Sequence, residues 1–266
     1  MTKRIGFIGA GKMAQAMIAG MTANGVDKQN IMASAATDRT INTVSEKYGI
    51  LTSLQNMDIA QFADILILAV KPDKHVTIIE EIKNHIKQDV IIVTIAAGIT
   101  LAGVESLFAF PVKAVRTMPN TPSLVGEGMS ALCANKYMTD RELTMVEQLF
   151  QCFGNSEWID EKLMDAVPAI SGSSPAYVYM FIEAMADGGV RQGIPRDQAY
   201  RLAAQAVLGA AKMVLETELH PGELKDQVCT PGGATIEAVA ALERAHFRGA
   251  VISAMESCTE KIKNLK

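Results

Sequence analysis

Two almost continuous apolar runs constrain the fold of this chain more than any other feature. They span residues 63–72 (ADILILAVKP) and residues 90–98 (VIIVTIAAG), and a helical segment near residues 77–86 separates them. Strands without polar alternation are buried on both faces, which is typical of a parallel sheet flanked by helices. The alternation continues in shorter β-branched runs and helical segments at residues 5–9, 12–23, 30–33, 39–48, 113–116, 129–133 and 157–159. The first part of the chain is therefore predicted to form a doubly wound α/β domain.

After residue 160 the pattern changes to helices alone. Ala, Met, Glu and Leu recur at helical spacing in the segments 174–190, 196–215, 235–243 and 247–262. Of the 266 residues, 49% are hydrophobic, and the mean hydropathy is +0.16. Long helices with so few charges are better buried against a second copy than exposed to water. We expect residues 161–266 to form an all-helical dimerisation domain.

The charge and the cysteine pattern exclude several classes of protein. The formal net charge is −4 and no basic block occurs, so neither nucleic acid nor a membrane surface is an expected partner. No apolar stretch approaches the ~18 to 20 residues of a membrane span, and the run at residues 5–8 is too short for a signal-peptide core. The four cysteines and four histidines lie far apart, without metal-ligand spacing. We expect a cytoplasmic protein without a metal site.

The segment Gly9-Ala10-Gly11-Lys12-Met13-Ala14 has the pattern GxGxxA, directly after the first strand and at the start of the first helix. The first glycine permits a tight turn, the second lets the backbone approach a pyrophosphate, and the small third residue lets the helix pack on the strand. The N–H groups at the start of the helix then face the anion. Residues 1–160 are therefore predicted to form a Rossmann-type domain that binds a dinucleotide.

The end of the second strand favours NADP over NAD. An enzyme that uses NAD places Asp or Glu there to bind the ribose hydroxyl. This chain has Ser34 at that point, no carboxylate before Asp38, and a cation at Arg39. Ser34 can hydrogen-bond a 2′-phosphate and Arg39 can add charge, although Arg39 fits a solvated helix start equally well. NADPH is the expected cofactor, and NADH remains the alternative.

Several motifs along the chain carry a resemblance to one enzyme family. They are AVKP at residues 69–72, AAG at 96–98, MPNTP at 118–122, SGSSPAY at 171–177, EAMADGGV at 183–190 and HPGELKDQVCTPGGATIEA at 220–238. With these motifs the sequence resembles pyrroline-5-carboxylate reductase over essentially its whole length. Two positions depart modestly from the family pattern: Ser174, where many members have Gly, and Thr230, where Ser is common. Both departures keep a small residue.

The resemblance implies an NAD(P)H-dependent reduction of L-1-pyrroline-5-carboxylate to L-proline, the final step of proline biosynthesis. It also implies homodimers formed through the helical domain, often assembled into decamers, with the active site between the dinucleotide domain of one subunit and the helical domain of its mate. The implied cofactor contacts are Gly9, Ala10, Gly11, Lys12, Met13, Ser34, Asn56, Ala69, Val70, Lys71, Pro72, Ala96, Ala97 and Gly98. The implied substrate contacts are Thr230, Gly232, Gly233, Ala234 and Thr235.

The segment 230–235 suits the chemistry of such a substrate, which is a cyclic imine that bears a carboxylate. The enzyme has to hold the imine carbon against the nicotinamide, bind an anion and contact the ring nitrogen. Two glycines open the backbone here, and the helix that follows offers N–H groups to the carboxylate. Thr235 is the expected catalytic residue, with its hydroxyl on the imine nitrogen. The alternative is that the segment only starts a helix and uses the threonine as its N-cap.

Two other functions stay open on the sequence alone. A 3-hydroxyacid dehydrogenase shares the two-domain plan but carries a lysine early in the first long helix of the second domain, and residues 171–189 contain neither Lys nor Arg. A non-catalytic NADP-binding protein would have lost the small residues and the threonines at residues 230–235, which are kept here. Lys71, Asn120, Glu218 and His220 can each lie near the site or serve the fold alone.

Overall fold

The computed structural model describes residues 3–264. Residues 1–2 of the expected dinucleotide-binding domain and residues 265–266 of the expected helical domain lie outside the described residues. The chain divides into two compact units. One, the sheet unit, contains the chain up to Ser173 together with the segment from Cys258. The other, the helical unit, is Ser174–Ser257. The domain boundary expected after residue 160 stays a prediction.

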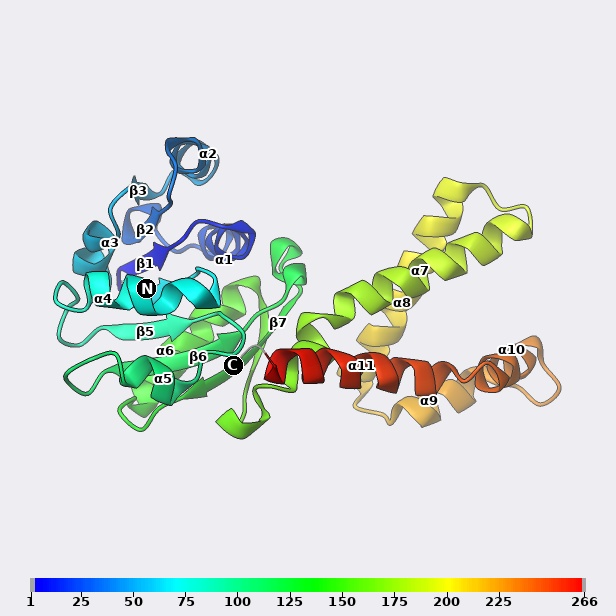
Figure 1. The fold of residues 1–266 in the computed structure, drawn as a ribbon. Coiled ribbons are helices and arrows are strands. Elements are labelled where there is room, and N and C mark those ends of the chain that lie inside the picture. The colour runs from blue at the N-terminus through cyan, green and yellow to red at the C-terminus, as the bar shows by residue number, and fades with distance from the viewer. Residues whose placement is uncertain (1–2, 265–266) are drawn as a thin grey trace. The chain divides into compact units, whose positions relative to one another are not determined.

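The described residues of the sheet unit form an eight-stranded sheet (Figure 1). Its strands are β1 (Ile5–Ile8), β2 (Ile31–Ser34), β3 (Leu51–Ser53), β4 (Ile65–Leu68), β5 (Ile91–Thr94), β6 (Lys113–Met118), β7 (Gly128–Ala134) and β8 (Gly154–Trp158). They lie in the order β3-β2-β1-β4-β5-β6-β7-β8, and β1 to β6 are all parallel. β7 runs antiparallel to β6 and parallel to β8. The predicted Rossmann-type, doubly wound sheet is confirmed.

Helices cover both faces of this sheet. They are α1 (Lys12–Ala23), α2 (Asp38–Tyr48), α3 (Asn56–Phe62), α4 (His75–Ile82), α5 (Leu101–Glu105) and α6 (Asp140–Phe150). In β4, Ile65 and Ile67 join a core with α1, α2 and α6, whereas Leu66 and Leu68 join a second core with α3, α4 and α5. Both faces of the strand are thus buried, which explains why its sequence is apolar without alternation.

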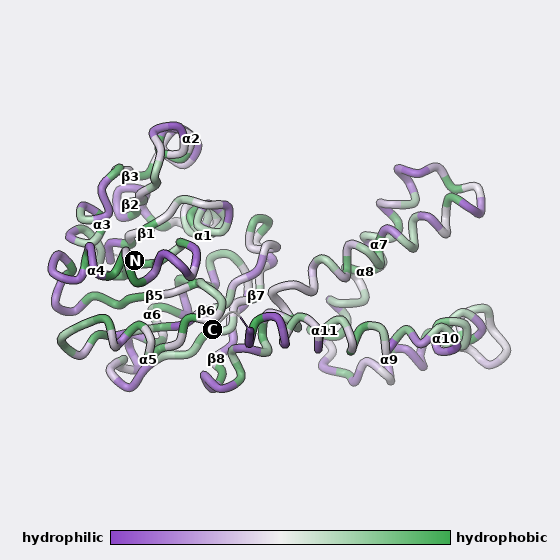
Figure 2. The backbone as a smooth tube through the Cα atoms, viewed as in Figure 1, coloured by the Kyte–Doolittle hydropathy of each residue, from purple (hydrophilic) through white to green (hydrophobic). Residues whose placement is uncertain are grey.

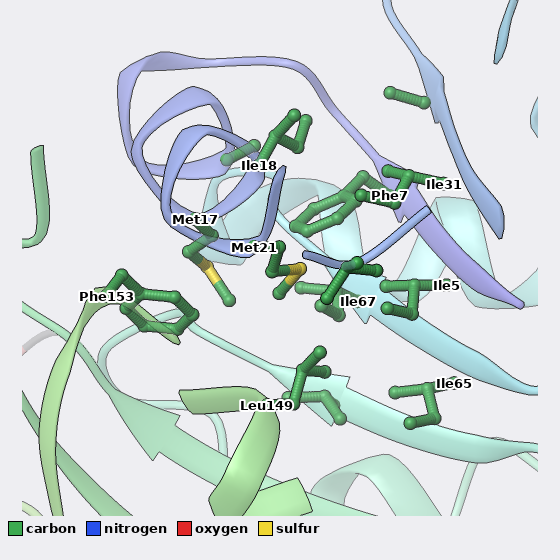
Figure 3. Packing of buried hydrophobic residues seen from close by; sticks show 14 of the residues in the cluster. Ile5, Phe7, Met17, Ile18, Met21, Ile31, Ile65, Ile67, Leu149 and Phe153 are labelled. Carbon is green, nitrogen blue, oxygen red and sulfur yellow. The ribbon is translucent and has the colours of Figure 1, made fainter. Parts of the chain in front are cut away.

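Helix α1 is fixed to the sheet by a buried stripe of side chains. Met17, Ile18 and Met21 are fully buried, and Figure 3 shows the two methionines directed at the strands that carry Phe7 and Ile67. Full burial of one such side chain stabilises the fold by about 1.5 to 3 kcal/mol. The packing places the first turn of α1 at the carboxyl end of β1, where the chain order reverses between β1 and β4. Ligands of open α/β sheets bind at that reversal point.

Several elements differ from the sequence-based prediction. Helix α4 runs over His75–Ile82 rather than 77–86, because the chain turns after Ile82 with a bond from His85 N to Ile82 O. Strand β8 ends at Trp158, so Ile159 lies outside it. The strands and α-helices that were not predicted are β3, α3, α5, α6 and, in the helical unit, α9 (Pro221–Val228). Strand β3 has three residues at the sheet edge and an exposed Leu51, so it leaves no apolar run in the sequence.

The helical unit consists of helices, as predicted. With α9 it contains α7 (Ser174–Arg191), α8 (Arg196–Thr217), α10 (Ala234–Arg244) and the larger part of α11 (Phe247–Lys263). Large apolar side chains along these helices are exposed, and Figure 2 shows hydrophobic stretches along α7 and α8. On α7 they include Tyr179, Met180 and Phe181, and Ala186 is the residue buried there. None of the helices among residues 3–264 is long and apolar enough to cross a membrane.

Helix α11 belongs to both units. It begins at Phe247 in the helical unit and returns to the sheet unit at Cys258. There the Cys258 Sγ donates to Ser173 Oγ at 3.4 Å. The two residues that flank the helical unit in the sequence are therefore in contact within the sheet unit.

Candidate functional site

The turn after β1 joins three strands at their carboxyl ends. The Gly9 N–H donates to the Ser34 carbonyl at the end of β2 (3.1 Å), and the Ala69 N–H donates to the Ile8 carbonyl (2.9 Å). Gly9 has φ +97°, and a Cβ placed on it would lie 2.6 Å from the Ala69 carbonyl oxygen. The turn therefore requires glycine for its conformation and for the close approach of the backbone after β4.

Gly11 is different, because no protein atom requires it to be glycine. It is the N-cap of α1 with an ordinary φ of −72° and no side-chain cap, and a Cβ placed there would meet nothing within 4 Å. The first turn of α1 contains no acidic residue, and Lys12, at its start, is exposed. The N–H groups of Lys12, Met13 and Ala14 have no partner inside the helix. Open space at a glycine, beside free N–H groups and a cation, fits a bound pyrophosphate.

The end of β2 carries a chain of three polar side chains. Ser34 is buried, and its hydroxyl donates to Asn56 Oδ1 at 2.7 Å. Asn56, the first residue of α3, donates through Nδ2 to Glu81 Oε2 on α4 at 3.0 Å. The carboxylate therefore fixes which way the Asn56 amide points, and with it the direction of the Ser34 hydroxyl. The sequence placed Ser34 and Asn56 together at the cofactor but gave no signal for Glu81.

The turns after β4 and β5 lie side by side on the same edge of the sheet, because these strands pair in parallel up to Leu68 and Thr94. The first turn contains Ala69, Val70, Lys71 and Pro72; the second contains Ala96, Ala97 and Gly98, the last at φ +80°. Lys71 is exposed, and its predicted contact with the cofactor stays a prediction. All the sequence-predicted cofactor positions thus belong to the carboxyl edge of the sheet or to the elements that start there.

The proposed substrate segment belongs to the helical unit and precedes α10. Gly232 has φ +69°, and the Gly233 N–H donates to the Thr230 carbonyl at 3.0 Å, which closes a tight turn. Gly233 is the N-cap of α10 and supplies no side-chain cap. The N–H groups of the first turn are therefore open to an anion.

Thr235 is the second residue of α10 rather than its cap. The helix runs over Ala234–Arg244, so the threonine N-cap proposed as the alternative explanation of this segment is wrong. Thr235 is half-buried, whereas Thr230 and Gly232 are exposed. Thr235 therefore belongs to the first turn of α10, whose N–H groups carry no side-chain cap. The predicted substrate and catalytic roles of these residues stay predictions.

Three of the residues whose roles the sequence left undecided are engaged in the fold. Asn120 is buried, donates to the Ser171 carbonyl and accepts from the Met129 N–H, both at 2.9 Å, so its amide is used within the sheet unit. His220 is the N-cap of α9 and accepts from the Gly222 N–H through Nδ1. Glu218 is the C-cap of α8 in the left-handed conformation. Asn120 and His220 are thus hydrogen-bonded within the fold, and Glu218 ends a helix.

Sequence reasoning missed a buried histidine in the cofactor region. His75 is only 2% exposed; its Nδ1 lies 3.2 Å from the Lys71 carbonyl and its Nε2 lies 2.9 Å from Thr94 Oγ1. Burial lowers its pKa, against the opposing effects of the Lys71 carbonyl and Asp73. The sequence carried one signal for it, a histidine three residues after the AVKP turn and at the start of an apolar helix.

Two of the cysteines, Cys133 and Cys152, are buried or half-buried thiols. Burial raises the pKa of the Cys133 thiol to about 12 and also raises that of Cys152. A thiol that stays protonated is a poor nucleophile. Among residues 3–264, no group of three His, Cys, Asp or Glu side chains could hold a metal ion.

Two family models match different parts of this chain. The profile described as pyrroline-5-carboxylate reductase dimerisation matches residues 161–265, and the one described as NADP oxidoreductase, coenzyme F420-dependent, matches residues 4–98. Pyrroline-5-carboxylate reductase of Escherichia coli (strain K12) is 46% identical over 266 residues, covering 100% of this chain and 99% of that protein.

Solved structures match over the same length. A pyrroline-5-carboxylate reductase from Coxiella burnetii has a TM-score of 0.93 and 33% identity, covering 100% of this chain and 99% of that one. The enzyme from Plasmodium falciparum, solved with NADP bound, has a TM-score of 0.89 and 32% identity, covering 99% and 98%. Identity at this level over the whole chain goes beyond a shared fold. The chain belongs to the pyrroline-5-carboxylate reductase family.

Proposed function

We propose that this chain reduces L-1-pyrroline-5-carboxylate to L-proline with NADPH, the final step of proline biosynthesis. The observation that carries the proposal is the start of α10, a helix N-terminus without a side-chain cap that has Thr235 as its second residue. The whole-length relationship to pyrroline-5-carboxylate reductases supports it.

The substrate makes modest demands on the protein. Its ring nitrogen is basic enough to be protonated near neutral pH, and the resulting iminium accepts a hydride at the imine carbon. When bound, NADPH supplies that hydride. The N–H groups at the start of α10 bind the substrate carboxylate, and the Thr235 hydroxyl accepts a hydrogen bond from the iminium N–H. The residues here thus bind and orient, and the proton on nitrogen comes from solvent.

The proposed cofactor site follows the edge of the sheet. The pyrophosphate binds to the turn that begins at Gly9 and to the first N–H groups of α1, and the adenosine ribose lies at Ser34 and Asn56. The nicotinamide half lies on the other side of β1, at the turns after β4 and β5. NADPH is favoured over NADH because β2 ends without a carboxylate and Arg39 follows it. Lys71 is proposed as a cofactor contact and not as a proton donor.

The competing hydroxyacid dehydrogenase has no support at the corresponding helix. Alcohol oxidation requires a base, and α7 (Ser174–Arg191) contains no lysine and one arginine, its last residue. Hydride transfer to an iminium needs no such base. This difference in chemistry separates the two activities.

We propose further that the functional form is a homodimer whose helical units bury one another, with decamers of five dimers as the larger assembly. The exposed apolar side chains of α7 and α8 supply the surface. The active site then combines the sheet unit of one subunit with the helical unit of its mate. Light scattering should give a mass of at least two chains, whereas a fully active species near 28.6 kDa would refute the shared site. A cytoplasmic location stays a prediction.

The activity is tested by following NADPH absorbance after addition of L-1-pyrroline-5-carboxylate to the purified protein. We expect loss of NADPH and formation of proline in equal amounts. The control is NADP with a series of 3-hydroxy acids, for which no NADPH should form. Turnover in the control reaction together with none in the first would replace imine reduction by alcohol oxidation.

A further inference from the structure

His75 occupies a position that the proposed function does not use. It is the first residue of α4, buried at the carboxyl edge of the sheet between β4 and β5. Both of its ring nitrogens are engaged, Nδ1 with the Lys71 carbonyl and Nε2 with Thr94 Oγ1. One partner belongs to the turn after β4, and the other ends β5.

The direction of these hydrogen bonds follows from the partners. A carbonyl oxygen only accepts, so the proton lies on Nδ1 and is donated to Lys71. In the neutral ring Nε2 is then an acceptor, and the Thr94 hydroxyl donates to it. Thr94 Oγ1 in turn accepts from the Ala96 N–H at 3.3 Å. A single directed chain therefore runs from the Ala96 N–H through Thr94 and His75 to the Lys71 carbonyl.

This chain of hydrogen bonds lies just beyond the point where the pairing of β4 with β5 ends. The register of β4 with β5 stops at Leu68 and Thr94, so the two turns beyond them lie outside the backbone ladder. His75 joins them with side-chain bonds instead. Burial lowers the pKa of the imidazole, which keeps the ring in the neutral form that the chain requires.

We propose that His75 is a positioning residue that holds the two turns in register for the nicotinamide half of NADPH. The proposal rests on the proposed function, because it takes these turns as cofactor contacts. The adenosine half binds on the other side of β1, at Ser34 and Asn56. None of the three hydrogen bonds that link Ala96, Thr94, His75 and Lys71 involves these residues, and α4 contacts Asn56 through Glu81 near its opposite end. His75 therefore acts on one half of the cofactor.

The test compares two ligands on the same variant. His75→Leu should weaken NADPH binding about 5- to 50-fold, as expected for the loss of one or two hydrogen bonds that order a site. Binding of 2′,5′-ADP, which lacks the nicotinamide half, should change less than about twofold. Direct titration of both ligands gives the dissociation constants without turnover, and the KM for pyrroline-5-carboxylate should stay nearly constant.

Two polar variants separate the two bonds. The amide nitrogen of Asn can replace Nδ1 towards Lys71, and the amide oxygen of Gln can replace Nε2 towards Thr94. We expect His75→Asn and His75→Gln each to recover part of the NADPH affinity lost in His75→Leu. His85→Leu is the matched control, because His85 is exposed just beyond the end of the same helix, and it should bind both ligands like the parent protein.

Each outcome has a defined meaning. Equal weakening of NADPH and 2′,5′-ADP in His75→Leu would show general damage to the fold, and unchanged binding of both would show that the link is unnecessary; either result overturns the proposal. If His75→Leu fails to fold, the same comparison in His75→Asn and His75→Gln decides. A parent protein that binds NADPH but leaves pyrroline-5-carboxylate unreduced would refute the proposed function alone, and the ligand comparison would still test His75.

Discussion

The role of Thr235 can be tested with three substitutions that together separate the hydroxyl from the shape of the side chain. Thr235→Ala removes the hydroxyl and the branch, Thr235→Val removes the hydroxyl but keeps the shape, and Thr235→Ser keeps the hydroxyl. The residue is half-buried in the helical unit, and the turn proposed to bind the pyrophosphate belongs to the sheet unit. All three variants should therefore fold and bind NADPH.

The position of Thr235 in α10 sets the expected stability. Gly233 is the N-cap, so the substitution removes no capping bond, which would otherwise cost about 1 kcal/mol. Inside a helix Ala is favoured over Thr by up to about 0.7 kcal/mol, so Thr235→Ala should leave the free energy of unfolding unchanged or slightly raised. The loss should appear in catalysis alone. One hydrogen bond to a charged nitrogen is worth roughly 1.5 to 3 kcal/mol, or about 10- to 150-fold in kcat/KM.

The assay measures melting temperature beside kcat/KM for NADPH-dependent reduction of pyrroline-5-carboxylate. We expect Ala and Val to lose activity in that range and Ser to recover most of it. Val as active as Ser would show that the hydroxyl takes no part in the reaction. A fall in melting temperature that parallels the loss of activity would show that Thr235 serves the fold.

Three further predictions concern the sheet unit. Gly9→Ala should lower the free energy of unfolding by about 2 to 4 kcal/mol, because it adds a Cβ at φ +97° and 2.6 Å from the Ala69 carbonyl oxygen. Gly11→Ala should leave urea unfolding unchanged, because a Cβ there meets nothing within 4 Å, and should weaken NADPH binding at least about 10-fold. Ser34→Asp should weaken NADPH binding at least about 10-fold and spare NADH, because a carboxylate would face the 2′-phosphate; equal losses in titrations with both cofactors would remove Ser34 from the 2′ position. Burial holds the pKa of His75 below its ordinary 6.5, so the unfolded chain binds more protons than the folded one just below that pH. The free energy of unfolding should therefore fall as the pH is lowered through this window. In urea unfolding, His75→Gln should show a smaller change of this free energy with pH.

The fold was predictable where local signals are strong. The first helix was expected at residues 12–23 and α1 occupies those residues, because the glycine turn and the apolar period both mark it. The uninterrupted apolar runs at β4 and β5 predict strands that are buried on both faces. Helix α6 also carried a signal, a capping box from Thr139 to Glu142, which was overlooked.

The features that the sequence did not predict depend on contacts between residues that lie far apart in the chain. Arg116 is 2% exposed on β6 and donates to Asp165 at 2.7 Å, a pair that no local pattern indicates. His75 becomes informative only once the register of β4 with β5 brings Thr94 beside it. Asn120 was a plausible ligand contact until its partners at Met129 and Ser171 were known. Sequence thus predicts residue types and spacing, and the assignment of partners requires the tertiary structure.

The return of α11 to the sheet unit makes the helical unit an insertion rather than an appended tail. The chain crosses between the units twice, after Ser173 and before Cys258. Truncation after Ser173 would therefore also delete a segment that packs with the sheet unit. Since Cys258 Sγ and Ser173 Oγ lie 3.4 Å apart, the two crossing points are close enough to be rejoined by a short linker. An isolated dinucleotide-binding scaffold is better obtained by excision of residues 174–257 than by shortening the chain.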